Sequence, residues 1–381
     1  MVLRLVDVLG VADQKSDQGF RYQTAATEQF CREQLGPGTE TTHLHGIIES
    51  VGDAHRARNP ALLAPAMLAY AYHLEEERAL NAEALDVLTT LDRVAAGRLA
   101  PSDAIATALR TARVNRRLAR FDAAMTAYEL AAARADAVHD HHSVLLSRLG
   151  RANVFWLRGN LAEAERWNRE VLQEATAVSD RDATARAHHG LGVVLTHEGQ
   201  VQESVPHYWH AFEAYDDESL RLMALHDLGI ALVKLGMVRS AERALRRVVE
   251  KSANQSGVQN AMVELMHCAS YRRDHVGFKR WQSRCESEID RMAPDIFVDY
   301  ALKLGIGMAR FGQFARAATQ FDIALRAAQK HGIHEFEFRI ERIRAGLHDC
   351  QLMAETEQTT IAESEHGAAL GAVASALNAL E

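Results

Sequence analysis

The chain of 381 residues carries 43 Lys and Arg against 51 Asp and Glu, and its formal net charge is −8. A negative protein has no general affinity for nucleic-acid phosphates or anionic membrane surfaces, so nucleic acid is not expected as a partner. Hydrophobic residues make up 48% of the chain, which excludes disorder over most of its length, and an aromatic content of 6% with only 6 Pro favours helices over strands.

The first residues, 1–60, are expected to form an N-terminal helical cap or accessory segment. Arg4 and Asp7 interrupt the apolar start, which leaves no signal-peptide core. No run of about 18 uncharged apolar residues follows, and we therefore expect a cytoplasmic protein without a membrane span. Breakers such as Gly36 and Pro60 delimit stretches of helical pattern that match no repeat.

Residues 61–354 repeat one pattern, in which a small residue is followed by a turn residue, an apolar residue and an Ala or Ser. The clearest copy contains, in this order, Gly305, Gly312, Phe314, Ala317 and Phe321. The turn residues recur at intervals of about 37 to 40 residues, apart from one gap of twice that length. They are Ala79, Ala119, Gly159, Gly199, Gly236 and Gly312. A degenerate copy within Met262 to Met292, with its turn near Asp274 and His275, is expected to fill the gap.

Glycines at the small-residue position stand in the middle of predicted helices. Gly192, Gly229 and Gly305 each cost their helix about 1 kcal/mol of intrinsic propensity. Such a loss is expected only where a second helix approaches closely. The turn glycines, in contrast, are expected to end one helix with a positive φ. The pattern predicts seven helix pairs.

At these positions the chain resembles the tetratricopeptide repeat family, whose small residue, turn glycine, apolar residue and closing alanine have the same relative spacings. The resemblance covers about Ala61 to Asp349. It implies an all-α, right-handed superhelical solenoid of antiparallel helix pairs, ended by a capping helix over 334–354. The family's closing proline is missing and the period is longer than usual, which is similar to the helical sensor arrays of bacterial regulators.

The resemblance also implies which side chains line the concave face, because residues of the first helix of each pair point inward in that family. In its register these are Arg110, Arg113, Arg117, Leu149, Asn153, Trp156, Arg186, His189, Val193, His226, Ile230, Tyr271 and Arg310. Arg can grip a carboxylate with two hydrogen bonds, Asn153 can hold a peptide backbone, and Trp156 offers an apolar anchor. We therefore expect a protein or peptide partner with an acidic or carboxylate-bearing segment. The arginine run 110–120 is also compatible with a solvated face.

Common catalytic signatures are absent from the sequence, so neither a catalytic site nor a cofactor is expected. His207 and His210 stand one helical turn apart, where metal binding is sterically feasible. No adjacent acid completes the set, and no metal site is assigned. The cysteines form no CxxC pair and are expected to be free thiols; they are Cys31, Cys268, Cys285 and Cys350.

The sequence favours a protein- or peptide-binding scaffold that uses the concave face and is not an enzyme. One alternative is the peptide- or ligand-sensing module of a bacterial transcription or signalling regulator, whose output lies at one end of the chain. A second is an enzyme with an unrecognised histidine-based or metal site. Residues 355–381 are expected to be an acidic, Ala-rich tail. Assembly into a homo-oligomer stays open, and the sequence does not identify the partner.

Overall fold

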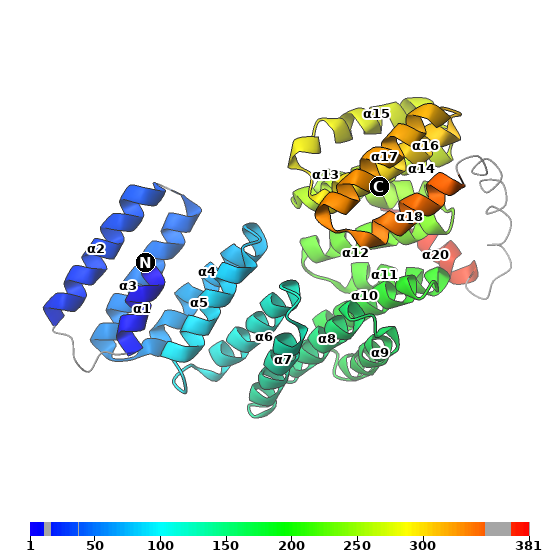
Figure 1. Cartoon of the computed structure of the whole chain (residues 1–381). Coiled ribbons are helices and arrows are strands. Elements are labelled where there is room, and N and C mark those ends of the chain that lie inside the picture. The colour runs from blue at the N-terminus through cyan, green and yellow to red at the C-terminus, as the bar shows by residue number, and fades with distance from the viewer. Residues whose placement is uncertain (11–16, 37, 347–366, 381) are drawn as a thin grey trace. The chain divides into compact units, whose positions relative to one another are not determined.

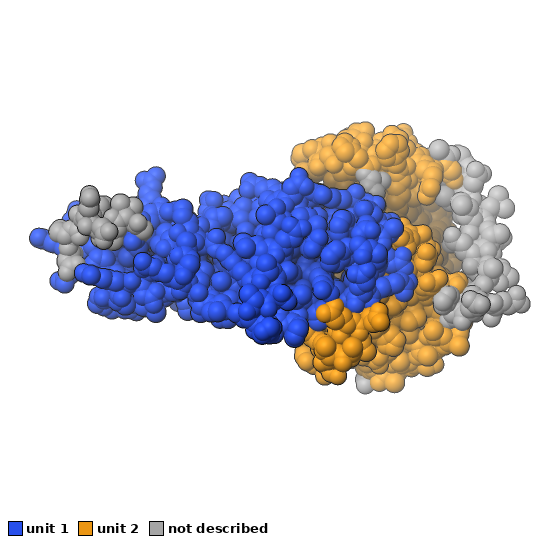
Figure 2. All heavy atoms as spheres, turned by 90° about the horizontal axis from the view of Figure 1, so that it is seen from below, with its two compact units in different colours: residues 1–171 blue, residues 172–381 orange. Residues whose placement is uncertain are grey.

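A computed structural model describes residues 1–10, 17–36, 38–346 and 367–380. All regular structure in these residues is helical, and no strand occurs among them. None of the helices in this part of the chain is both long and apolar enough to cross a membrane. The chain forms two compact units, residues 1–171 and 172–381, which Figure 2 shows in different colours. The division falls inside a helix, α9, and not in a linker.

From α4 onwards the helices follow one another as seven antiparallel pairs, α4 with α5 through α16 with α17 (Figure 1). This confirms the expected all-α class of sequential helix pairs. Unit 1 contains α1 (Val2–Gly10), α2 (Asp17–Leu35), α3 (Thr39–Ala57), a 3-10 helix (Pro60–Leu63), α4 (Ala64–Tyr72), a π-helical turn (His73–Glu77), α5 (Asn81–Val94), α6 (Pro101–Arg117), α7 (Phe121–Asp136), α8 (His141–Leu157) and the first part of α9 (Leu161–Ala177). Unit 2 contains the rest of α9, then α10 (Arg181–His197), α11 (Val201–Ala214), α12 (Glu218–Lys234), α13 (Val238–Lys251), α14 (Gln255–Tyr271), α15 (His275–Glu286), a 3-10 helix (Ile289–Arg291), α16 (Pro294–Arg310), α17 (Phe314–His331), α18 (His334–Ala345) and α20 (Gly367–Asn378).

Every expected turn residue lies between the two helices of its pair and adopts a positive φ. The angle is 74° at Gly312, and it is 54° and 55° at Ala79 and Ala119. Alanine in this conformation is strained, because its Cβ crowds the following carbonyl oxygen. The degenerate copy also has such a turn, at Arg273 with a φ of 55°, directly before the expected position.

Hydrogen bonds close these turns in a recurring way. The residue after the positive φ donates its N–H to a carbonyl of the preceding helix, as Gln313 does to Met308 at 2.9 Å. The bond satisfies a carbonyl that would otherwise be orphaned at the helix end. Several first helices begin after a residue whose side chain caps the helix. One such residue is Asp217, whose carboxylate accepts a hydrogen bond from the Leu220 N–H at 2.9 Å.

The mid-helix glycines allow the second helix of a pair to press a large side chain against the first. A Cβ on Gly305 would lie 2.6 Å from a ring carbon of Phe321, and one on Gly192 would lie 2.7 Å from the ring of Tyr208. Atoms do not pack so closely, so only glycine fits without a shift. This confirms the expected reason for these residues. The same relation holds for Gly229 with Leu245 and for Gly150 with Tyr128.

The N-terminal helices pack onto the first repeat pair. Helices α1 and α2 contact α3, α1 also contacts α5, and α3 contacts α4. Their side chains join one buried cluster that includes Val6, Ile47, Val51 and Met67. Full burial of such a side chain contributes about 1.5 to 3 kcal/mol. These helices and the first pair therefore share one hydrophobic core.

The C-terminal helices cover two places on unit 2. Helix α18 packs against α16 and α17, while α20 packs against the second helices α11 and α13 through the buried Leu370, Val373 and Leu377. Arg247 donates to the Leu380 carbonyl oxygen at 2.6 Å, just beyond the end of α20. Residues 347–366, with Cys350 and much of the expected acidic tail, lie outside the described residues. The other cysteines, Cys31, Cys268 and Cys285, are free and buried.

Replacing Gly305 with Ala is expected to lower the free energy of unfolding by about 1 to 3 kcal/mol, in spite of the better helix propensity of Ala. The added methyl group would meet the Phe321 ring and, at 3.2 Å, the Ala317 carbonyl oxygen. Urea unfolding followed by far-ultraviolet circular dichroism measures the change.

Gly46 in α3 provides the matched control, because a Cβ there would have no atom within 4 Å. Gly46→Ala is expected to raise the free energy of unfolding by up to about 1 kcal/mol. Equal stabilisation by both substitutions would contradict the close approach of α17 to α16.

Candidate functional site

The residues expected to bind a partner lie on what we term the first-helix face, formed in each unit by the first helices of the repeat pairs. In unit 1 this face includes the contacting helices α6 and α8, and in unit 2 it includes α10, α12, α14 and α16, each of which contacts the next. Most of the expected side chains are half-buried, so each keeps some surface open to a ligand. They are Arg110, Arg113, Asn153 and Trp156 in unit 1 and Arg186, Val193, His226, Ile230, Tyr271 and Arg310 in unit 2, while Arg117 is exposed. Leu149 and His189 are buried.

In unit 1 the arginines of α6 converge on one carboxylate, that of Glu75. Arg110 donates to it at 2.8 Å, and Arg113 donates through Nε at 2.6 Å and Nη2 at 2.9 Å. Arg117 donates to the Glu75 carbonyl oxygen at 3.1 Å and to the Glu76 carboxylate at 3.0 Å. The Glu75 side chain is 0% exposed, whereas that of Arg113 is 34% exposed. The arginine run is thus neither a fully solvated face nor a set of unpaired charges.

The π-helical turn His73–Glu77 presents Glu75 to these arginines. A π turn inserts an extra residue into a helix and redirects the side chains around it. Tyr72, which stands where other copies have a small residue, lies before this turn, and the Arg110 guanidinium lies 5.0 Å from the centroid of its ring. Three guanidinium groups face the two carboxylates of Glu75 and Glu76. One positive charge is therefore left without a carboxylate within this cluster.

Replacing Glu75 with Gln is expected to lower the free energy of unfolding by about 2 to 4 kcal/mol, because removing one partner of a buried ion pair leaves the other charges uncompensated. Urea unfolding measures the loss. Glu77→Gln is the matched control in the same turn, because that side chain is 54% exposed and pairs with His73 at 2.7 Å. Its loss should stay below about 1 kcal/mol. Equal losses would show that the arginines do not depend on Glu75.

In unit 2 the first-helix face carries a hydrogen-bonded set around Asp227. The His189 Nε2 lies 2.9 Å from one carboxylate oxygen, and the His226 Nδ1 lies 3.1 Å from the other. The second ring nitrogen of His189 lies 3.3 Å from the Tyr215 hydroxyl. Burial raises the pKa of Asp227, but hydrogen bonds from the two histidines outweigh burial and hold this pKa well below its usual range. Asp227 therefore stays ionised and orients both rings.

A second polar set connects α14 and α16. The buried Lys303 donates to the carboxylates of Glu264 and Asp299, both at 2.5 Å. Burial lowers the pKa of Lys303, but the two carboxylates outweigh it and the pKa is raised. On the same helices Arg310 donates to the Ser270 hydroxyl at 2.8 Å, and its guanidinium lies 3.5 Å from the centroid of the Tyr271 ring.

The sequence pattern did not identify Asp227, Glu264 and Lys303 as site residues, although they share a register position with Arg110. Each stands the same number of residues before the turn residue of its own pair. Two acids, one lysine and one arginine occupy this position, while α8 and α10 have a glycine there. Its chemistry changes from pair to pair, so composition alone does not mark it. Comparison of the register across all pairs could have found these residues.

The histidines considered as metal ligands form a cluster with a third one. His188 of α10 lies with its Nδ1 2.8 Å from that of His207 in α11, and its ring centroid is 5.1 Å from that of His210. Even so, no group of three or more His, Cys, Asp or Glu side chains within the described ranges could hold a metal ion. Burial lowers the pKa of His188 to about 4, and the charges of the other two histidines add to the effect.

The low pKa of His188 predicts that mild acid weakens the fold. An unfolded histidine binds a proton near pH 6.5, whereas folded His188 does so only near pH 4. Between these values the unfolded state binds more protons, so stability falls as the pH falls. The melting temperature of a His188→Gln variant should therefore decrease less than that of the wild type between about pH 6.5 and about pH 5. His331→Gln, which removes an exposed histidine, should keep the wild-type slope; identical slopes for all three proteins would exclude this role of His188.

The antiparallel pairs, their glycine contacts and their half-buried first-helix face define a tetratricopeptide-like helical repeat protein. The fold is similar to the apo form of the quorum sensor NprR from B. thuringiensis, with a TM-score of 0.54 and 13% identity over 86% of this chain and 97% of that chain. It is also similar to the apo form of RapI, with a TM-score of 0.52 and 10% identity over 70% and 97%. NprR in complex with its cognate peptide NprX has a TM-score of 0.50, with 12% identity over 86% and 97%. No protein-family profile and no curated protein matches the sequence. At such low identity the likeness concerns the fold.

Proposed function

We propose that this chain is a peptide-sensing helical repeat module and that a first-helix face binds the peptide. The observation that carries the proposal is the row of half-buried, chemically mixed side chains on the first helices. The fold adds support, because NprR has a similar one and its structure includes a cognate peptide. A protein-binding scaffold is the coarser form of the same function.

The first-helix face of unit 2 offers an apolar site for a peptide side chain. Val193 and Ile230 are half-buried and occupy the same register position on the neighbouring helices α10 and α12. Two branched side chains in this relation offer a shallow apolar surface for a ligand side chain. His226, held in place by Asp227, stands on the same helix as Ile230 and supplies a polar group beside that surface. Fixed polar groups next to an apolar surface orient a peptide and reduce the entropy lost on binding.

A carboxylate-bearing ligand would suit the arginines of unit 1. The internal acids leave one positive charge there, and the Arg113 and Arg117 side chains are about one third exposed. Asn153 on α8 makes no side-chain hydrogen bond within the described part of the chain, so its amide is available to a peptide backbone. These residues remain the proposed contacts for an acidic segment.

A library of random short peptides displayed on phage tests the proposal, because such a library can select a ligand whose sequence is unknown. We expect the wild-type protein to enrich a consensus peptide. An Ile230→Lys variant should bind that synthetic peptide at least about tenfold more weakly, because a charge would replace an apolar contact. Fluorescence anisotropy measures the affinities.

Val276→Lys is the matched control, because Val276 is 78% exposed and lies on a second helix, α15. It should bind the peptide like the wild type. The proposal that the chain senses a peptide would be contradicted if no peptide were enriched, or if the Ile230→Lys variant bound the peptide as tightly as the wild type does. Binding of folded proteins without short peptides would favour the scaffold.

A further inference from the structure

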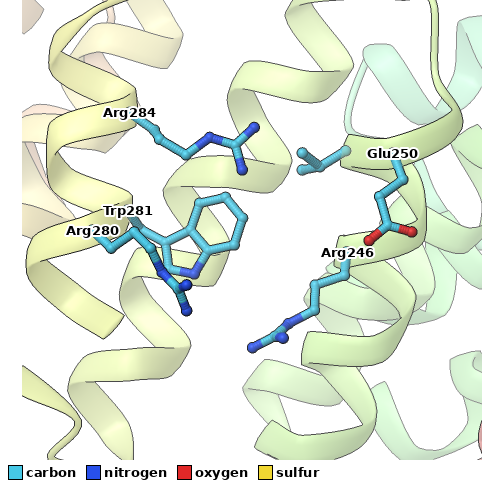
Figure 3. A pocket seen from close by; sticks show the side chains of 6 residues that line it. Arg246, Glu250, Arg280, Trp281 and Arg284 are labelled. Atoms are coloured by element: carbon cyan, nitrogen blue, oxygen red, sulfur yellow. The ribbon is translucent and has the colours of Figure 1, made fainter. Parts of the chain in front are cut away.

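A hollow outside the first-helix face lies between the second helices α13 and α15 of unit 2. Its volume is about 220 Å³, and it is lined by Arg246, Val249 and Glu250 from α13 and by Arg280, Trp281 and Arg284 from α15. Figure 3 shows the side chains of the two helices facing each other across it, with the Trp281 ring between them. No contact of the proposed peptide site takes part in this lining.

The lining carries three guanidinium groups against one carboxylate. Arg280 and Arg284 stand one turn apart on α15, where like charges repel each other. Within the described residues the Arg280 guanidinium has no hydrogen bond or ion pair, and Arg246 pairs only with Glu242, at 3.7 Å. The hollow therefore gathers positive charge that the surrounding carboxylates neutralise only in part.

Three other arginines near the hollow have close hydrogen-bond partners. Arg243 and Arg247 of α13 hold the end of α20 through Asn378 and Leu380, and Arg272 pairs with Glu242 at 2.6 Å. In contrast, the guanidinium groups of Arg280 and Arg284 have no hydrogen bond or ion pair within the described part of the chain. The whole chain, moreover, has a net charge of −8, which repels anions in general. Any anion binding must therefore depend on the local charges of the arginines that line the hollow.

Trp281 orients the guanidinium group of Arg284 in the hollow. The Trp281 side chain is packed into the core, and its residue is 8% exposed. The Arg284 guanidinium lies 4.7 Å from the centroid of the Trp281 ring. A cation held over an aromatic face has fewer conformations to lose when a ligand arrives. Arg284 is therefore partly oriented before binding.

We propose that this hollow binds a phosphate monoester dianion. The planar guanidinium of an arginine can donate two parallel hydrogen bonds to two phosphate oxygens. Three arginines and one glutamate give the lining two positive charges in excess, which balance the two negative charges of a dianion. The volume leaves room beside the phosphate for a short organic group, and Glu250 can accept a hydrogen bond from an ammonium or hydroxyl on it. A small phosphorylated molecule and a phosphorylated side chain of another protein both present this chemistry.

Isothermal titration calorimetry at low ionic strength tests the site with phosphoethanolamine, with a short phosphoserine peptide, and with ethanolamine as the ligand without phosphate. We expect saturable binding of at least one phosphate ligand and none of ethanolamine. Arg280→Gln with Arg284→Gln should weaken binding at least about tenfold, because two charge-assisted contacts are lost. Added salt should weaken it as well.

Arg239→Gln is the matched control, because this exposed arginine lies on α13 but does not line the hollow. It should bind like the wild type, and circular dichroism should show that both variants fold. Tighter binding of the peptide would assign the site to a phosphorylated partner, and tighter binding of phosphoethanolamine would assign it to a small molecule; either result supports the proposal. Absence of saturable binding, or equal binding by the folded double variant, would overturn it.

Discussion

The contact between a mid-helix glycine and a large side chain of the next helix sets the distance between the helices of a pair. Phe321 lies where a side chain on Gly305 would begin, and Tyr208 has the same relation to Gly192. Because no larger residue fits, the two helices have one close-packed arrangement. The direction of every other side chain on the first helix follows from that arrangement. A half-buried face is the result, on which each register position has a defined environment.

That environment requires polar side chains on the face to find partners, because an unpaired buried charge is expensive. Glu75 in unit 1 meets this requirement with arginines from α6, and Lys303 in unit 2 meets it with two carboxylates. Such networks hold side chains in fixed orientations. The arginines that the sequence offers as ligand contacts are therefore also structural, and a ligand would meet a prearranged surface.

The side chains of a second helix serve several separate structural roles. Helix α13 uses Arg243 and Arg247 to hold the end of α20, while Arg246 on the same helix lines the hollow next to α15. Alanines and leucines face the first helix of the pair, so the arginines of α13 are left for the outer surface. The amphipathic helix α13 thus packs against the first helix of its pair, binds the end of α20 and contributes side chains to the charged hollow.

The sequence alone determined the helix pairs and their turns, because these depend on relations within one pair. Glycine, turn residue and closing alanine recur at spacings that the chain itself displays, and even Ala79 and Ala119 could be assigned as turn residues by their positions. Only the tertiary structure decided which polar groups meet. Glu75 and Arg113 are 38 residues apart, and Arg247 and Leu380 are 133 apart. No local pattern links such positions, since a charged residue follows the same helical spacing whether it meets water, a ligand or a buried partner.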